Sequence, residues 1–389
     1  MADPPDSEKG INMKIAFTTT FDSRDVGNWS GTPYHMAKGF QQDGAEIEHI
    51  GGLKRKLPPF FKLKQFWKNL AAGQRESPRF NTTAAKYYSE QVAEILKKSN
   101  ANVVISPLIN PIAYLDCKQP LVLWTDALYA SLLGFYPGFS SHSASSIEQG
   151  NIITRECLSR CSLAIFSSDW AARTALEIYG ADKNKVKVVP FGANIECHHT
   201  LDDIKAMLKS RPRDRIKLLF VGKHWDRKGG DTVFNVTKAL HAAGLAVELN
   251  FVGCMPPKDV EVPAYIKCHG FISKRTPEGI AKITGLFRES HFLFLPSRAE
   301  AYGIAFCEAN AFGLPVLTSY VGGISTVVKD HINGMTFSLS SPVSAYCEYL
   351  SNLMQDYRRY DELALSAFHE YQTRLNWGAA TKTVREMFK

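Results

Sequence analysis

Short, continuously apolar runs alternate with amphipathic stretches along the whole chain. The apolar runs fall at 14–19, 102–106, 121–125, 163–167, 186–190, 216–222, 247–253, 291–296 and 315–319. Runs of this kind are typical of strands buried on both faces of a parallel sheet. The stretches between them, such as 84–98 and 231–243, have the spacing of amphipathic helices. The alternation predicts βαβ units in doubly wound sheets, an α/β fold class.

A polar stretch at 194–214 carries no pattern of a buried strand and separates the runs into two sets. We therefore expect an N-terminal domain at 13–195, completed by a C-terminal helix at 371–389, and a second domain at 196–370. In open α/β sheets ligands lie beyond the carboxyl ends of strands, and two facing sheets form a cleft there. The loops that follow strands are therefore where chemistry is expected.

Composition narrows the class of protein. Of the 389 residues 45% are hydrophobic and 22% are charged, which excludes a largely disordered or collagen-like chain. The net charge of +8 suits anionic partners. The eight cysteines form no CxxC pair, the closest spacing being Cys157 to Cys161, and are expected to be reduced core thiols of a cytoplasmic protein.

Neither the N-terminal residues nor the apolar runs indicate membrane insertion. No run approaches the roughly 20 consecutive apolar residues of a spanning helix. Residues 1–12 are polar and contain two prolines, unlike a signal peptide, and are expected to be a disordered leader or an expression remnant.

Residues 291–323 combine a strand, a loop carboxylate and a helix that starts at a glycine. The apolar run ends at Pro296, Glu300 follows, and a helix is expected from Gly303 to Gly313. A glycine at a helix start exposes backbone N–H groups, which suit an anion such as phosphate. Glu300 and Glu308 beside such a site are explained if they accept hydrogen bonds from sugar or ribose hydroxyls. Two surface glutamates on a helix are the alternative.

Residues 218–230 place two cations after a strand. The run LLFVG ends in glycine, and Lys223 and Lys228 follow before the next amphipathic stretch. The two lysines could neutralise a diphosphate bound at the helix start of residues 291–323. Without that neighbouring segment they would be interpreted as exposed lysines on a turn.

These segments resemble the retaining, nucleotide-sugar-dependent glycosyltransferases of family four, of the bacterial polysaccharide hexosyltransferase type. The resemblance rests on the Glu-x7-Glu pattern, the strand before it and the G-L-P-V-L after it. Lys223 stands where the family usually has arginine. Residues 163–194 resemble the last unit of the family's N-terminal domain, which ends in P-x-G before the interdomain linker. The resemblance covers about 160–340 well and the N-terminal half weakly. It implies the GT-B fold, in which two Rossmann-like domains face a central cleft.

The resemblance also implies roles for individual residues. Glu308 would hold ribose hydroxyls and Glu300 the sugar hydroxyls. Lys223 and Lys228 would bind the diphosphate, Lys228 and Glu300 being counted as catalytic. The remaining donor-site residues would be Tyr302, the N–H groups of Gly303 and Ile304, and Phe271 and Ile272 at the base. No metal and no cofactor are expected.

The N-terminal half offers two further candidates. The loop 27–32 follows the first strand, and the family places there a small-residue loop, here including Gly31, that closes over the donor phosphates. An ordinary βα turn is the alternative, and the loop lacks the Gly-x-Gly-x-x-Gly fingerprint of dehydrogenases. Asp126, after the strand 121–125, is a candidate sugar contact, acceptor-facing base or helix cap. Cys197-His198-His199 and Asp202-Asp203 lie in the polar linker and predict no metal site.

Residues 53–79 are unusually basic and aromatic. They hold eight Lys or Arg against one Glu, together with Phe60, Phe61, Phe66 and Trp67. This mixture suits an anionic membrane surface or a lipid-linked acceptor, with a solvated basic loop as the alternative. No nucleic-acid partner is expected, because no recognised nucleic-acid module surrounds the segment.

The resemblance therefore predicts a glycosyltransferase of polysaccharide biosynthesis. UDP-glucose is the expected donor, and a glycan or lipid-linked molecule is the expected acceptor of the hexose. A UDP-sugar epimerase of the same fold and a non-catalytic nucleotide-sugar-binding scaffold are the alternatives. The expected location is the cytoplasm, with attachment to the inner face of the membrane as a possibility.

Overall fold

The computed structural model describes residues 13–72 and 75–388, so the expectation for residues 1–12 lies outside it. The chain forms two compact units. The first comprises Met1–Phe166, Ala171–Val189 and Thr381–Lys389, and the second comprises Ser167–Trp170 and Pro190–Ala380. Compactness does not test whether either unit folds by itself, so the domain bounds expected from the sequence stay a prediction.

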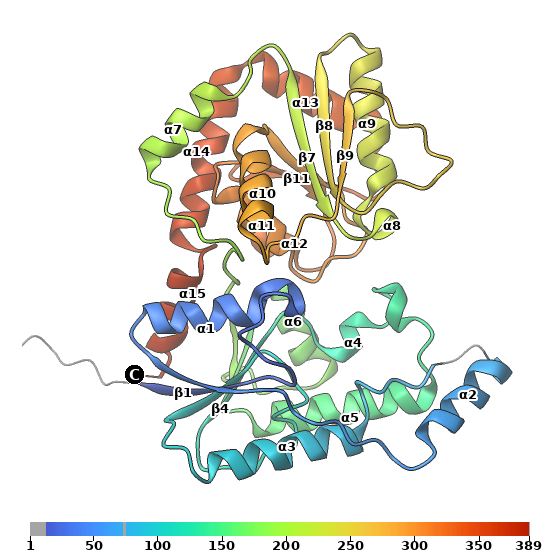
Figure 1. Ribbon diagram of the computed structural model, residues 1–389, viewed down its shortest axis with the longest axis vertical. Coiled ribbons are helices and arrows are strands. Elements are labelled where there is room, and N and C mark those ends of the chain that lie inside the picture. The colour runs from blue at the N-terminus through green and yellow to red at the C-terminus, as the bar shows by residue number, and fades with distance from the viewer. Residues whose placement is uncertain (1–12, 73–74, 389) are drawn as a thin grey trace, which may run out of the picture. The chain divides into compact units, whose positions relative to one another are not determined.

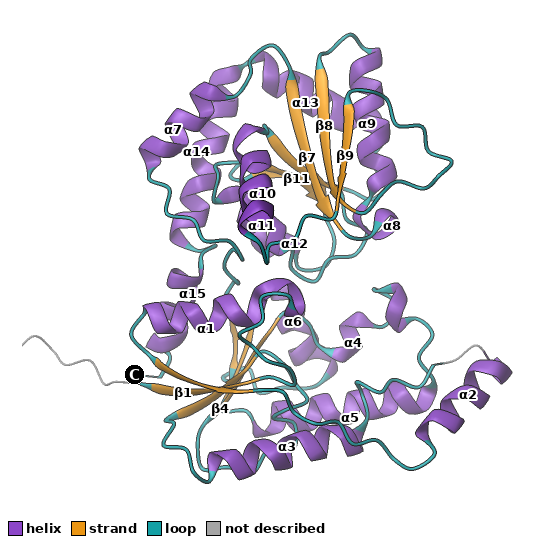
Figure 2. Cartoon of the chain, in the orientation of Figure 1, coloured by secondary structure: helices purple, strands orange, loops and turns teal. Residues whose placement is uncertain are grey.

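The first unit contains a parallel sheet in the order β2-β1-β3-β4-β5-β6 (Figure 1). Its strands are β1 (Lys14–Thr18), β2 (Glu46–Ile50), β3 (Val103–Ser106), β4 (Leu121–Thr125), β5 (Leu163–Phe166) and β6 (Val186–Val188). Its helical segments are η1 (Asn28–Gly31), α1 (Thr32–Gln42), α2 (Phe61–Ala72), α3 (Thr82–Leu96), α4 (Tyr129–Leu132), η2 (Pro137–Phe139) and α5 (Ala144–Arg160), with α6 (Asp169–Arg173) and η3 (Thr174–Ile178) next along the chain. The helices α3 and α5 lie together on one face of the sheet and α1 lies on the other (Figure 2). An ion pair of 2.8 Å between Arg385 and Asp43 ties the C-terminal segment to the end of α1.

The second unit contains a parallel sheet in the order β12-β11-β10-β7-β8-β9. Its strands are β7 (Ile216–Gly222), β8 (Val247–Gly253), β9 (Ile266–Gly270), β10 (Phe292–Leu295), β11 (Val316–Ser319) and β12 (Gly334–Phe337). Its helices are α7 (Leu201–Ser210), α8 (Trp225–Lys228), α9 (Gly230–Ala242), α10 (Pro277–Glu289), α11 (Ile304–Asn310), α12 (Ile324–Val327), α13 (Val343–Gln355) and α14 (Tyr357–Thr373), followed by α15 (Trp377–Glu386). The helices α9 and α13 pack together, and α7 packs against α10 and α14. The expected α/β class with two doubly wound parallel sheets is confirmed.

The three strands that sequence analysis missed are all at sheet edges. Each of the nine predicted apolar runs contains a strand, whereas β2, β9 and β12 were not predicted. An edge strand has a neighbour on one side only and is less covered. The residues of β2 and β9 are accordingly mostly half-buried or exposed. A rule that looks for continuously apolar runs therefore finds the inner strands and passes over these edges.

A buried arginine fastens the helix that carries Glu308. The guanidinium of Arg211 donates to the carbonyl oxygens of Phe312 (2.9 Å) and Gly313 (3.0 Å), just beyond α11, and to that of Arg288 (3.2 Å) at the end of α10. It also donates to the Tyr360 hydroxyl at 2.7 Å. A cation at helix C-termini stabilises them, and here it also satisfies carbonyl groups that water cannot reach. Arg211 thereby connects the end of the linker helix α7 to the ends of α10 and α11 at the amino end of the sheet.

Replacing this arginine should destabilise the second unit. We expect Arg211→Met to lower the free energy of unfolding by at least about 3 kcal/mol, because several buried carbonyl groups lose a charged donor at once. Urea unfolding followed by circular dichroism measures the change. Arg213→Met is the matched control, since Arg213 is exposed and should cost about 1 kcal/mol or less. Equal unfolding midpoints for the two variants would contradict this role.

Candidate functional site

The candidate site lies at the carboxyl end of the second sheet. The strands β7 and β10 are neighbours in the sheet, with Leu218 paired to Phe292 and Leu219 to Leu293. Because both strands run in the same direction, the loops that follow them emerge side by side. One loop carries Lys223 and Lys228, and the other carries Glu300.

Lys228 and Glu300 form a largely buried ion pair. Lys228 ends the short helix α8, and its Nζ contacts Glu300 Oε2; the two side chains are 12% and 11% exposed. Arg227 reinforces the pair, with Nη1 lying 3.7 Å from Glu300 Oε2 and donating to the Ala299 carbonyl at 2.9 Å. Burial lowers the pKa of Lys228, and the Glu300 carboxylate opposes that shift. A lysine and a glutamate that are 72 residues apart in the sequence are thus held in contact.

A glycine allows the two loops to come this close. Gly229 follows Lys228 with φ of +72°, and a Cβ atom there would lie 2.2 Å from the Pro296 carbonyl oxygen. Any other residue would push the two loops apart. In the second loop the hydroxyl of Ser297 is buried and has no hydrogen-bond partner among the residues that the structure describes, so it is available to a ligand or a water.

Glu308 forms a second ion pair that sequence analysis did not predict. Its side chain is 3% exposed, and Oε1 contacts the Nζ of Lys274. Burial raises the pKa of Glu308, while Lys274 opposes the shift. Lys274 follows β9, an edge strand that the hydrophobic pattern did not reveal. No sequence motif marks this lysine, and only the knowledge that β9 ends at Gly270 could have pointed to it.

The residues at the start of α11 have different degrees of access. Gly303 is buried with φ of +97°, a conformation that favours glycine, and Ile304 is half-buried. Tyr302 is buried, and its hydroxyl donates to the Phe191 carbonyl at 2.6 Å. The Tyr302 side chain is therefore engaged in packing, and only its backbone is open to a role in donor binding.

Cations gather at the end of β7. The Nζ of Lys223 lies 4.8 Å from the centre of the Phe271 ring, an exposed ring beside the half-buried Ile272. Burial lowers the pKa of His224, and Arg227, Lys228 and Lys223 lower it further. The three cations around His224 make the local potential positive, as an anion site requires.

Two predicted residues belong to the first unit. Gly31 is buried with φ of +86° at the start of α1, and the two residues before it, Trp29 and Ser30, also have positive φ. Three left-handed residues in a row are unusual, and strain of this kind is concentrated at functional loops. Asp126 follows β4 and is half-buried. These residues lie at the carboxyl end of their own sheet.

The linker residues have structural roles. Asp203 closes a capping box with Thr200 at the start of α7, and Cys197 Sγ lies 2.8 Å from His199 Nδ1. All eight cysteines are free thiols. In the described part of the chain, no group of three or more His, Cys, Asp or Glu residues could hold a metal ion. No helix among the described residues is long and apolar enough to cross a membrane.

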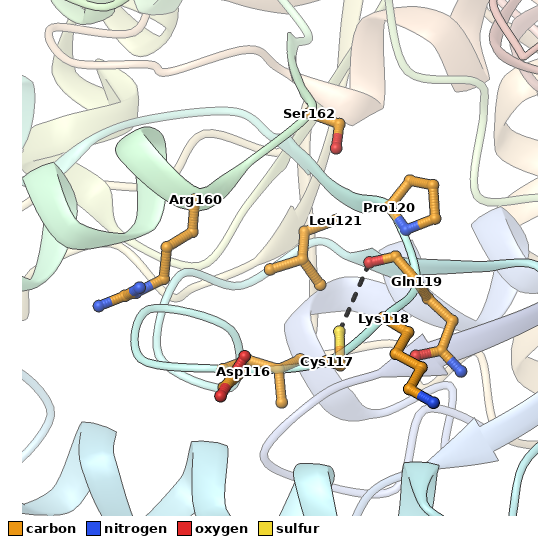
Figure 3. A pocket seen from close by; sticks show the side chains of 9 residues that line it. Asp116, Cys117, Lys118, Gln119, Pro120, Leu121, Arg160 and Ser162 are labelled. Atoms are coloured by element: carbon orange, nitrogen blue, oxygen red, sulfur yellow. Dashed lines mark hydrogen bonds between the residues drawn. The ribbon is translucent and has the colours of Figure 1, made fainter.

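One surface cavity, of about 390 Å³, lies elsewhere. Residues 115–121 line it together with Arg160 and Ser162, and Figure 3 shows the Cys117 thiol directed at the Gln119 carbonyl, 3.5 Å away. The cavity adjoins the amino ends of β4 and β5, opposite to the end where ligands of such sheets bind. It contains none of the predicted site residues.

Comparisons with known proteins agree with this geometry. Residues 215–356, which carry both ion pairs, match the family described as "Glycosyl transferases group 1". The D-inositol 3-phosphate glycosyltransferase of Xylanimonas cellulosilytica is 26% identical over 251 residues, which are 62% of this chain and 60% of the relative. The chain therefore spans less than two thirds of that relative's length.

Solved structures extend the likeness to the whole chain. Sucrose-phosphate synthase from Thermosynechococcus elongatus has a TM-score of 0.68 at 15% identity, covering 97% of this chain and 98% of that one. Anabaena Alr3699/HepE in complex with UDP-glucose has a TM-score of 0.60 at 15% identity, with 97% and 99% covered. At such identities the likeness shows the fold alone. Residues 215–356 thus match a family of glycosyl transferases, and the chain as a whole has the GT-B fold of these solved structures.

Proposed function

We propose that the protein transfers a hexose from a nucleoside diphosphate sugar to a hydroxyl of a glycan or lipid-linked acceptor. UDP-glucose is the proposed donor, and the transfer keeps the configuration of the anomeric carbon. The observation that carries the proposal is the pairing of Lys228 with Glu300 among further cations at the carboxyl end of β7. Support for the donor comes from Anabaena HepE, a protein of similar fold whose structures hold UDP and UDP-glucose.

The ion pair suits a donor that is both anionic and rich in hydroxyl groups. When a diphosphate arrives, Lys228 can turn from Glu300 to the phosphate oxygens, and Lys223 adds a second positive charge. Glu300, released from Lys228, can then accept hydrogen bonds from the sugar hydroxyls. After the exchange Lys228 is paired with phosphate, and Glu300 keeps Arg227 at 3.7 Å besides the hydroxyls. Neither buried charge is then left without a partner, a state that would cost several kcal/mol.

The second pair would hold the ribose. Lys274 contacts one carboxylate oxygen of Glu308, and the other oxygen would accept a hydrogen bond from a ribose hydroxyl. The exposed ring of Phe271 and the side chain of Ile272 would pack against the base. The backbone N–H groups of Gly303 and Ile304 would assist the phosphate contacts, as the family resemblance implies.

The reaction would be a same-face displacement. The bond between the anomeric carbon and the donor phosphate oxygen breaks, and its electron pair stays on the departing UDP. The acceptor oxygen bonds to the same face of that carbon, and its proton passes to the departing phosphate. The cations stabilise the negative charge that develops on the phosphate, so the contribution of the protein is electrostatic and positional. From the resemblance alone, Gly31 would close on the phosphates and Asp126 would contact sugar or acceptor.

Lys228 should be needed for turnover. We expect Lys228→Met to slow UDP release from UDP-glucose by about a hundredfold or more, because a cation at a desolvated phosphate contributes about 2–5 kcal/mol. A coupled assay for free UDP measures the rate. Lys217→Met is the matched control: this lysine is similarly buried, pairs with Glu289 at 2.9 Å and lies at the amino end of the same strand.

The control should stay within about threefold of the wild-type rate, since it removes a comparable ion pair far from the phosphates. Equal losses in the two variants would indicate a stability effect and contradict the assignment. If the wild-type protein binds UDP-glucose but releases no UDP with any acceptor tried, the scaffold alternative is favoured instead.

Glu308 should recognise the ribose. We expect the wild-type protein to bind UDP about tenfold or more tightly than 2′-deoxy-UDP, because a hydrogen bond to a charged group contributes about 1.5–3 kcal/mol. Glu308→Gln should bind UDP more weakly and lose most of this preference. Calorimetric titration of UDP and of 2′-deoxy-UDP into the wild-type protein and into Glu308→Gln gives the four dissociation constants, from which the preference of each protein is calculated. An unchanged preference in Glu308→Gln would show that the carboxylate does not contact the 2′-hydroxyl.

Activity should survive removal of divalent metals. The proposed site already supplies positive charge through Lys223, Lys228 and Arg227, so no divalent ion is needed at the diphosphate. Transfer rates measured before and after treatment with EDTA should agree within about twofold. Complete loss that magnesium or manganese restores would replace this mechanism with a metal-dependent one.

A further inference from the structure

The helix α2 presents an apolar face to solvent. Leu63, Phe66, Trp67 and Leu70 recur at i, i+3, i+4 and i+7, which places them on one side of the helix. Together with Phe60 they are between 54% and 80% exposed. The opposite side faces the protein, where Phe61 is buried and the Gln65 amide donates to the Glu76 carbonyl at 3.5 Å. The amphipathic helix is therefore turned with its apolar face outward, at the periphery of the first unit (Figure 1).

The backbone before α2 is built to expose one more aromatic ring. Phe60 has φ of +59°, a left-handed conformation that is uncommon for residues other than glycine, and the turn is closed by Phe61 N donating to the Pro58 carbonyl at 3.2 Å. The residue Phe60 lies in this strained turn, and its ring is the most exposed of the five apolar side chains. Strain kept for an exposed apolar side chain points to a function for that side chain.

A basic segment that precedes α2 in the sequence is held in place against α3. The amide of Gln91 on α3 holds the backbone of Lys54 from both sides, accepting from its N–H at 2.9 Å and donating to its carbonyl at 2.8 Å. The Arg55 Nε donates to the Tyr88 hydroxyl at 2.9 Å, and the Lys56 Nζ lies over the Tyr87 ring. All three residues are nevertheless exposed.

The charge along this part of the chain has one sign. Lys62 on α2 is exposed as well, and the sequence from 53 to 75 contains no acidic residue. A protein partner that covered five apolar side chains here would have to be acidic as well as apolar. The surface of a bilayer with anionic headgroups supplies both properties at once. The helix has only 12 residues, too few to span a bilayer, so it would lie in the plane of the interface.

We propose that the apolar face of α2 inserts into the headgroup region of an anionic lipid bilayer while Lys54, Arg55, Lys56 and Lys62 contact the lipid phosphates. This surface is separate from the donor site on the second unit. It would bring the enzyme to the membrane in which a lipid-linked acceptor resides. Salt screens the attraction between the basic side chains and the lipid phosphates but leaves the burial of the apolar face unchanged, so salt weakens the binding and does not abolish it.

The test is sedimentation of the full chain with vesicles of phosphatidylcholine, with or without phosphatidylglycerol. A charge variant changes Lys54, Arg55, Lys56 and Lys62 to Ser, and a face variant changes Leu63, Phe66, Trp67 and Leu70 to Ser. A matched control changes Lys97, Lys98, Lys183 and Lys187, exposed lysines elsewhere on the first unit, to Ser. We expect wild type and control to sediment with anionic vesicles, and both test variants to lose about tenfold or more in partitioning.

Insertion of the face has its own readout. Trp67→Phe should fold like wild type, and the difference between their fluorescence spectra reports Trp67 alone. A blue shift of that difference on adding anionic vesicles is expected. Thermal stabilisation by UDP, measured on every variant, shows that the fold and the donor site remain intact, so loss of membrane binding and failure of the proposed donor site are distinguished.

Three results would overturn the proposal. One is equal sedimentation with neutral and anionic vesicles, and another is unchanged sedimentation of the face variant. The third is a concentration-dependent dimer in gel filtration that the face variant abolishes while vesicle binding persists, because the occupant of the face would then be a second copy of the chain.

Discussion

The pairing of β7 with β10 is the constraint on which the candidate site depends. These strands are separated by about 70 residues of chain, yet they lie next to each other in the middle of the second sheet. Their shared direction carries Lys228 and Glu300 to the same edge. Aromatic packing holds the loop that carries Lys228 against the sheet, with Phe220 stacked on Phe251 at 4.1 Å and Trp225 packed against Phe251. Arg211 fastens α11 from the other side. The ion pairs are thus consequences of the sheet and the packing around it.

Charge and burial are balanced at this edge. Each glutamate of the Glu-x7-Glu pattern is largely removed from water, and each has a lysine from a different loop as its partner. A site that held only carboxylates at such depth would favour their protonated forms. The lysines keep the carboxylates available as acceptors and hold positive charge ready for phosphates. The same residues can therefore serve an empty site and an occupied one by exchanging partners.

Much of this could be predicted from the sequence, and the omissions have physical causes. The inner strands, the glycine at the start of α11 and the grouping of Lys223, Lys228, Glu300 and Glu308 in loops after strands follow from local patterns. The Lys274–Glu308 contact does not, because it depends on where an edge strand ends. The packing of Tyr302 against Phe191 depends on a segment more than a hundred residues away. The composition of residues 53–79 indicated a membrane surface, but only the structure shows which side of α2 faces outward. Residues 73–74 lie outside the described part of that segment.

The polarity of the edge strands has a consequence for the protein in a crowded solution. An unpaired strand edge can recruit a strand from another molecule and start aggregation. Here β2 carries Glu46 and Glu48, β6 carries Lys187 and β9 carries Lys267, and three of these four side chains are exposed. A foreign strand that added to one of these edges would have to accommodate a charged side chain. The charges that hid β2 and β9 from a search for apolar runs therefore also oppose the addition of a foreign strand at those two edges, whereas the edge strand β12 carries no charged residue.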